Sequence, residues 1–186
     1  MPTATPTPTA TAKPTPAPRI SLSKCTITVK DRVYTGKAHK PAPVVQYRDA
    51  TLKKGRDYTV AYENNVAIGT AKVILTGKGK YTGTVKKSFK INPKAVKQSS
   101  LAAGEGTITV KWRKGRDITG YQVQCSLKKG FASPRTVTVS DAATTTAEIR
   151  KLKPSTTYYV RIRAYRKVKS KKYYSAWSKV GSVMVE

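Results

Sequence analysis

The residues best suited to binding chemistry lie near the carboxyl end of the chain. Residues 161–174, RIRAYRKVKSKKYY, place seven arginines and lysines among three tyrosines. Basic groups bind phosphate or sulfate, and aromatic rings stack on sugars or bases. The pattern predicts a polyanion-binding hairpin that uses Arg161, Arg163, Arg166, Lys167, Lys169, Lys171, Lys172 and Tyr173. A structural explanation stays open, because long basic side chains also cover exposed sheet faces and protect strand edges from aggregation.

Residues for catalysis or metal binding are scarce. The 186 residues include nine Asp and Glu, one His and two Cys. A Ser-His-Asp triad or a zinc site therefore has almost none of the histidines and cysteines it would need. His39, in KAHKPAP before Pro41, is predicted to be an exposed loop residue. We therefore expect no enzyme, no metal site and no cofactor.

Three further patterns have chemical interpretations. Lys, Asn64, Asn65 and Glu63 could form an isopeptide bond only if a lysine, an asparagine and an acid were buried together. The GKGKYTG stretch at 77–83 lacks the spacing of a phosphate-binding loop and indicates turns. Cys25 and Cys125 lie one hundred positions apart and are predicted to be buried free thiols, with an interdomain or intermolecular disulfide as the alternative.

The positive charge is distributed along the whole chain. Thirty-seven Lys and Arg against nine Asp and Glu give a formal net charge of +28, divided as +2 in residues 1–19, +11 in 20–93 and +15 in 94–186. This distribution excludes a single basic tail on a neutral body. It predicts a lysine-covered surface that either keeps the protein soluble or attracts polyanions.

The first residues, MPTATPTPTATAKPTPAP, hold six of the eleven prolines. Alternating proline and threonine favours extended polyproline II and cannot build a core. We expect residues 1–19 to be a disordered Thr/Pro-rich linker, with another domain of the same polypeptide upstream. Met1 is not followed by the pattern of a secretory signal peptide, and no apolar run has the length of a membrane helix.

From Ile20 onward the apolar residues repeat with a period of two, which is typical of strands. The predicted fold class is all-β, with two antiparallel β-sandwich domains at 20–93 and 94–186. The predicted strands are Val44–Tyr47, Tyr58–Tyr62, Thr70–Leu75, Thr84–Ile91, Thr107–Trp112, Gly120–Ser126, Arg135–Val139, Thr145–Ile149, Tyr158–Tyr165 and Ser175–Val185.

Residues 20–92 resemble the immunoglobulin-like repeats of surface proteins from Gram-positive gut bacteria. The resemblance rests on YTGK at 34–37, LKKGRDYTVAYENN at 52–65, GTAKV at 69–73 and GKGKYTGT at 77–84. The matching residues suit a scaffold and include no catalytic set.

Residues 94–186 resemble a fibronectin type III module. The run LKPSTTYYVRIRAY at 152–165 has the family's spacing, and Tyr158 would be its tyrosine corner, with a hydroxyl bonded to upstream backbone. SAWS at 175–178 resembles the opening of the last strand. The resemblance implies a structural role for Trp112, Tyr121, Leu152, Pro154, Tyr158 and Trp177.

The two resemblances and the linker together predict a non-catalytic module, secreted or on a bacterial cell surface, that spaces, displays or anchors a neighbouring domain. The alternative is adhesion to an anionic polysaccharide, mucin or cell-wall polymer through basic faces. Nucleic-acid binding is disfavoured, because the sequence has neither a recognition helix nor an RNA-binding aromatic motif.

Overall fold

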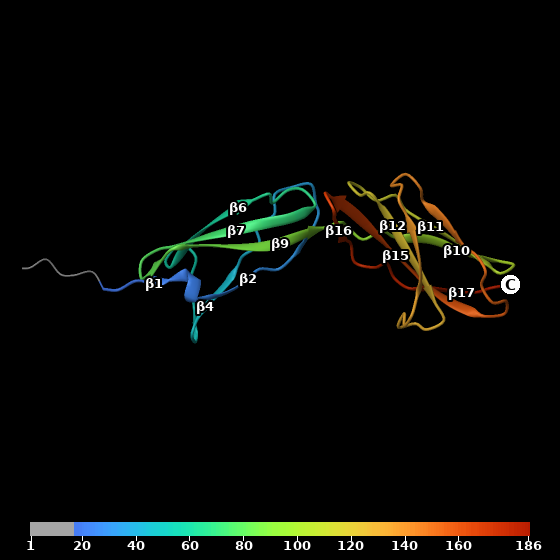
Figure 1. Ribbon diagram of the computed structural model, residues 1–186, viewed down its shortest axis with the longest axis horizontal. Helices are drawn as coiled ribbons and strands as arrows, with labels where there is room; N and C mark the ends of the chain where they lie inside the picture. Colours follow the sequence, from blue (N-terminus) through green and yellow to red (C-terminus); the bar gives the residue numbers. More distant parts are fainter. Residues whose placement is uncertain (1–16) are drawn as a thin grey trace, which may run out of the picture.

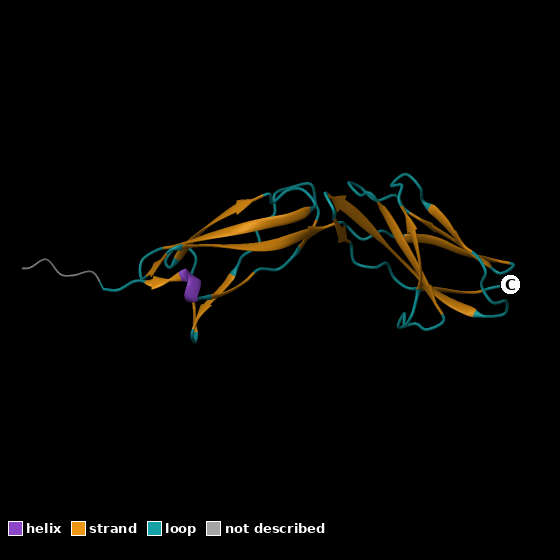
Figure 2. Ribbon diagram, viewed as in Figure 1, coloured by secondary structure: helices purple, strands orange, loops and turns teal. Residues whose placement is uncertain are grey.

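The computed structural model describes residues 17–186 and consists of strands, loops and a single turn of 3-10 helix (Figures 1 and 2). Two β-sandwiches follow one another along the long axis, and in the described residues no strand before Asn92 pairs with a strand after Gln98. The predicted fold class, all-β with two sandwiches, is confirmed. Of the predicted linker, only residues 17–19 lie within the described part.

The N-terminal sandwich contains three hydrogen-bonded groups of strands, β2-β4-β5, β3-β9-β7-β6 and the pair β1-β8. Its elements are β1 (Ile20–Ser21), η1 (Leu22–Lys24), β2 (Thr26–Thr28), β3 (Arg32–Val33), β4 (Val44–Tyr47), β5 (Ala50–Thr51), β6 (Tyr58–Glu63), β7 (Gly69–Gly77), β8 (Tyr81–Thr82) and β9 (Thr84–Asn92).

The core of this sandwich follows from strict alternation in β7. Ala71, Val73 and Leu75 are fully buried, while Thr70, Lys72 and Thr76, on the other face, are exposed. Successive side chains of a strand point to opposite faces, so one face of β7 joins the core and the other meets water. The residues buried with them include Leu22, Ile27, Val45, Leu52, Tyr58, Phe89 and Ile91.

The N-terminal sandwich departs from the predictions in three details. The pairs β1-β8 and β3-β9 are parallel, whereas all other pairs of named strands are antiparallel. Cys25 lies between η1 and β2 and is half-buried, so its predicted burial is wrong. Arg19, placed in the linker by the prediction, donates to the carbonyl oxygens of Gly79 and Tyr81 and is therefore fixed to this sandwich.

The C-terminal sandwich packs the sheet β10-β11-β14 against the sheet β13-β12-β15-β16, and β17 pairs with the first part of β15. Its elements are β10 (Gln98–Gly104), β11 (Thr107–Trp112), β12 (Gly120–Ser126), β13 (Arg135–Val139), β14 (Thr146–Ile149), β15 (Thr157–Val168), β16 (Lys171–Tyr174) and β17 (Gly181–Met184).

Two tyrosine hydroxyls hold loops against the core of the C-terminal sandwich. Tyr158 is buried and its hydroxyl accepts a hydrogen bond from the backbone N–H of Lys153 at 3.1 Å, which is the geometry expected of a tyrosine corner. The hydroxyl of Tyr121 accepts from the N–H of Gly115 and donates to the carbonyl of Ala142. The three loops that contain Lys153, Gly115 and Ala142 are thereby tied to central strands.

The last predicted strand, Ser175–Val185, is wrong over its first half. Residues 175–180 are not strand, and β17 begins only at Gly181. Strand β10 was not predicted, because its Ser99, Ser100, Ala102 and Ala103 do not give a clear alternation of apolar and polar residues.

The segment between the sandwiches is short. β9 ends at Asn92 and β10 begins at Gln98, and the buried side chains of Pro93 and Val96 fix the residues between them. No helix in residues 17–186 has both the length and the apolar character needed to span a membrane.

We expect Tyr158→Phe to lower the free energy of unfolding by about 1–2 kcal/mol, because the N–H of Lys153 loses its acceptor. Chemical denaturation measures this loss. Tyr159→Phe is the matched control, since no hydrogen bond of the Tyr159 hydroxyl is found in residues 17–186. Equal effects of the two changes would contradict the role given to Tyr158.

Candidate functional site

The predicted binding residues lie on the hairpin formed by β15 and β16, but they differ in exposure. Arg166, Lys167, Lys169, Lys171 and Lys172 are exposed, Arg161 and Arg163 are half-buried, and Tyr173 is buried. The structure therefore divides the predicted set into a stacked pair of arginines, a group of exposed cations and a buried tyrosine.

Arg161 lies between two aromatic rings on the outer face of β15. Its guanidinium carbon is 3.9 Å from the ring centroid of Phe131 and 4.3 Å from that of Trp177. Its Nε and Nη2 both donate to the side-chain oxygen of Gln124, at 2.9 and 2.8 Å. Gln124 is on β12, directly opposite Arg161 in the sheet register.

Arg163, two residues further along the same face, repeats this arrangement. Its guanidinium carbon is 4.3 Å from the centroid of Trp177 and 3.9 Å from that of Tyr174. Its Nε and Nη2 donate to the side-chain oxygen of Gln122, at 3.0 and 2.7 Å. We call the resulting series the arginine–aromatic stack; it consists of Phe131, Arg161, Trp177, Arg163 and Tyr174.

The stack constrains what the two arginines can do. Burial lowers the pKa of both guanidinium groups below the ordinary value, and the ring faces and the glutamine oxygens offset this desolvation. Each planar group is covered on both faces. Arg161 and Arg163 therefore stabilise the outer face of the sheet and are not free to close around a polyanion.

Trp177 is positioned by the irregular segment at 175–178, whose two serines replace regular strand pairing. The backbone N–H groups of Ala164 and Ile162 each donate to a serine hydroxyl, Ser175 Oγ and Ser178 Oγ, at 3.0 Å. In return, the N–H groups of both serines donate to the carbonyls of Ala164 and Ile162. The segment is thus fastened to β15 on both sides of Trp177.

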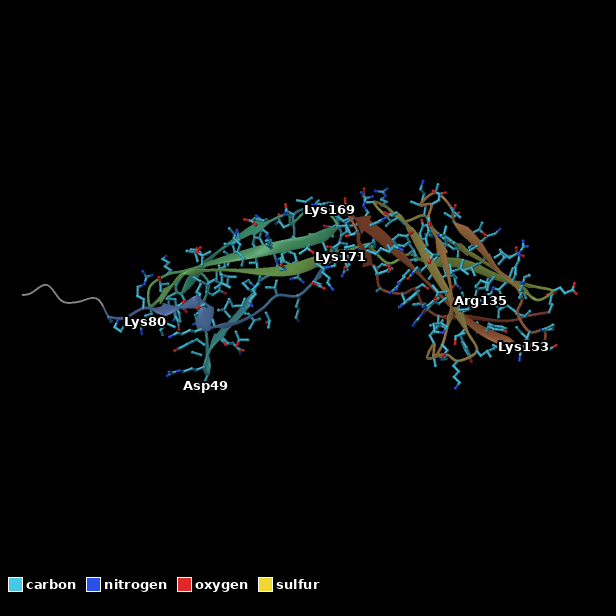
Figure 3. The ribbon with its side chains drawn as sticks, viewed as in Figure 1. Asp49, Lys80, Arg135, Lys153, Lys169 and Lys171 are labelled. Atoms are coloured by element: carbon cyan, nitrogen blue, oxygen red, sulfur yellow. The ribbon has the colours of Figure 1, made fainter. Side chains whose placement is uncertain are left out.

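The tip of the hairpin lies at the junction between the two sandwiches, where Figure 3 labels Lys169 and Lys171. The hydroxyl of Tyr173 is 2.7 Å from Oγ1 of Thr70 on β7. The ammonium groups of Lys171 and Lys172 lie over the rings of Tyr173 and Tyr165, at 5.4 and 4.7 Å from their centroids. Tyr173 is therefore a contact between the sandwiches and not part of an open binding face.

The other chemically suggestive residues are held in structural contacts. His39 is half-buried, which corrects the expected exposure, and its backbone carbonyl accepts from the side-chain amide of Asn65 at 2.8 Å. Glu63 forms an ion pair with Lys86 at the surface. These contacts do not form the buried triad that an isopeptide bond requires.

Both cysteines are free thiols. Cys125 is buried as predicted, and burial raises the pKa of its thiol. No group of three His, Cys, Asp or Glu that could hold a metal ion occurs within residues 17–186.

The residues predicted to be structural lie in or beside the core. Trp112, Tyr121, Leu152 and Tyr158 are buried in the core cluster, Pro154 is exposed in the loop before β15, and Trp177 is the centre of the stack. Sequence reasoning missed Phe131, Gln122 and Gln124 as partners of the arginines. The alternation of glutamine with Val123 in β12 was the available signal, since it places both glutamines on one outer face.

Comparison with known families agrees with this geometry. Residues 92–180 match the family model of the fibronectin type III domain. The chain contains a fibronectin type III domain. Fibronectin type III domains are generally non-catalytic.

Two solved structures resemble part of the chain. The fn3 domain of human contactin 1 has 15% sequence identity and a TM-score of 0.42, and the match covers 50% of this chain and 77% of that one. A structure described as a myokine has 20% identity and a TM-score of 0.38, and the match covers 50% of this chain and 95% of that one. No curated protein matched the chain.

We expect Arg163→Lys to lower the free energy of unfolding by about 1–2 kcal/mol, because an ammonium group keeps the charge but loses the planar stack and the paired bonds to Gln122. Arg166→Lys, an exposed change on the same strand, is the matched control and should change stability by less than about 0.5 kcal/mol. Thermal or urea unfolding measures both. An unaffected Arg163→Lys protein would contradict the stabilising role of the stack.

Ser175→Ala should destabilise the fibronectin type III domain by about 1–3 kcal/mol, since it leaves the buried N–H of Ala164 without an acceptor. Ser182→Ala, at an exposed position of β17, provides the comparison. Amide hydrogen exchange at Ala164 should become faster in the first variant and stay unchanged in the second. Unchanged exchange in both would show that Ser175 is dispensable.

Proposed function

We propose that the chain is a non-catalytic extracellular module that spaces and displays a neighbouring domain of the same polypeptide at a bacterial surface. The observation that carries this proposal is the placement of the two ends of the described chain. The segment entering at Ala17 and the carboxyl end at Glu186 lie at opposite ends of the long axis (Figure 1). A module with this geometry separates whatever is attached to its two ends.

A spacer holds its length only if its junction resists bending, and the contacts at this junction support that requirement. The Tyr173–Thr70 hydrogen bond crosses from the hairpin to β7. The linking residues 93–97 are short, and Pro93 restricts its own backbone. Relative motion of the two domains is the default expectation for tandem modules. These contacts instead favour a restricted set of orientations.

Within this proposal the chain has three parts. Residues 1–19 form a Thr/Pro-rich linker, residues 20–93 a bacterial immunoglobulin-like domain, and residues 94–186 the whole of the fibronectin type III domain. The sheets and the separate core clusters on either side of residue 93 support the division. The upstream partner would be another domain of the same protein, and the location secreted or at a Gram-positive cell surface.

A second candidate function is adhesion to an anionic glycan, mucin or wall polymer. Five exposed cations of the hairpin support it: Arg166, Lys167, Lys169, Lys171 and Lys172. The stacking of Arg161 and Arg163 and the burial of Tyr173 remove three of the eight residues first assigned to this surface. Nucleic-acid binding has less support, because no exposed aromatic series accompanies the remaining cations.

The spacer proposal predicts that the two sandwiches tumble together. Backbone relaxation by NMR should give one rotational correlation time for both in the wild type. Tyr173→Phe should make the two correlation times diverge, because the bond to Thr70 is lost while a buried ring of the same size remains.

Tyr159→Phe is again the matched control, and it should leave the common correlation time unchanged. Two sandwiches that tumble independently in the wild type would overturn the proposal of a length-holding spacer.

A further inference from the structure

A groove lies at the junction between the two sandwiches, separate from the exposed cations of the β15–β16 hairpin. Its volume is about 690 Å³. Three segments line it: residues 33–36 at the end of β3, the linking residues 94–97, and the loop 113–117 between β11 and β12. One wall therefore belongs to the N-terminal sandwich and another to the fibronectin type III domain.

The groove is strongly basic. Five of its lining residues are cations, and one is an acid, Asp117. Within residues 17–186, none of the five has a carboxylate within ion-pair distance, and residues 1–16 contain no acidic side chain. The five cations are Lys94, Lys97, Arg113, Lys114 and Arg116.

The single acid forms a hydrogen bond within the groove. The carboxylate of Asp117 interacts with the hydroxyl of Tyr34, and this hydrogen bond is the main cause of the raised pKa of that tyrosine. The charge of Arg166 opposes this shift. Asp117 keeps its negative charge in this hydrogen bond, but one carboxylate against five cations leaves the groove with an excess of positive charge.

The backbone that presents these cations is held in place. The N–H of Gly115 donates to the Tyr121 hydroxyl, and the N–H of Arg113 donates to the carbonyl of Lys97, which joins the loop to the linking segment. A Cβ at Gly115 would lie 2.8 Å from Cδ1 of Ile118, so glycine permits this close packing. A fixed backbone reduces the ordering cost when a ligand binds.

We propose that this groove binds a segment of an anionic polysaccharide, one that carries sulfate or carboxylate groups at regular spacing. This inference deepens the proposed function, because it places the ligand of an adhesive spacer at the junction and not along the hairpin. Five cations that form no ion pair and outnumber the one acid of the groove attract such a chain through space and hold its anionic groups at short range.

The composition of the walls distinguishes this ligand from a nucleic acid. Tyr34 is the one aromatic residue among the lining residues, and its hydroxyl is engaged by Asp117. Single-stranded nucleic acids are held by a series of stacking rings, and duplex recognition uses a helix or ribbon that enters a groove of the DNA. A polysaccharide bound through its charges needs neither.

The test uses the full chain and a heparin-derived octasaccharide, with calorimetry at about 150 mM salt, where surface charges are screened beyond about 8 Å. The variant combines Lys94→Glu, Lys97→Glu and Lys114→Glu. The matched control combines Lys80→Glu, Lys129→Glu and Lys153→Glu, which are exposed residues outside the groove; Figure 3 labels Lys80 and Lys153 away from the junction. Both proteins lose the same net charge.

We expect the groove variant to bind at least about 10-fold more weakly than the wild type and the control variant to change affinity by about 2-fold or less. Equal losses in the two variants would show that the whole surface binds and would overturn the groove. No binding of the octasaccharide by the wild type would also overturn it.

A single-stranded dT oligonucleotide of the same charge provides the final arm. Tighter binding of this oligonucleotide than of the octasaccharide would overturn the assigned ligand class. The five cations all belong to the linking segment and the fibronectin type III domain, and the readout is affinity instead of a correlation time. Failure of the groove and failure of the spacer proposal can therefore be told apart.

Discussion

The alternation of side chains along β15 is the constraint on which the C-terminal half of the structure depends. The inward side chains of Tyr158, Val160, Ile162 and Ala164 belong to the core, so the residues between them must face outward. Two of these outward residues are Arg161 and Arg163. Without neighbouring rings, their hydrophobic stems and planar guanidinium groups would be exposed to solvent on the sheet. The stack with Phe131, Trp177 and Tyr174 covers them and in doing so fixes the segment at 175–178. At the far end of the hairpin, Tyr173 reaches the other sandwich.

Sequence periodicity predicted the fold well wherever one strand face is buried. Thr107–Trp112, Gly120–Ser126 and Arg135–Val139 were predicted with their observed ends, because apolar and polar residues alternate there and turn residues flank them. It failed at residues 175–180, where serine hydroxyls take the place of backbone pairing. No pattern of period two can signal a bond that a side chain makes to the neighbouring strand.

The candidate site was predicted by residue type but not by environment. The basic residues at 161–172 lie on a hairpin, as predicted. The sequence could not show that the ring of Phe131, from a distant loop, would cover Arg161. Nor could it show that Gln124 and Gln122 of β12 would accept hydrogen bonds from Arg161 and Arg163. The groove at the junction was missed for a similar reason. Lys94 and Lys97 meet the loop of Lys114 through the pairing of β10 with β11, and residues 33–36 of the other sandwich form the opposite wall. Such a site depends on tertiary contacts between distant segments.

The two free thiols determine under which redox conditions the protein can fold. Cys25 and Cys125 belong to different sandwiches and neither forms a disulfide, so no covalent cross-link closes either fold. Both sandwiches are held by apolar packing and sheet hydrogen bonds, and the C-terminal one also by its tyrosine anchors and covered arginines. The chain can therefore reach its native state without an oxidant or a disulfide-forming catalyst, and a reducing or anoxic environment does not weaken it.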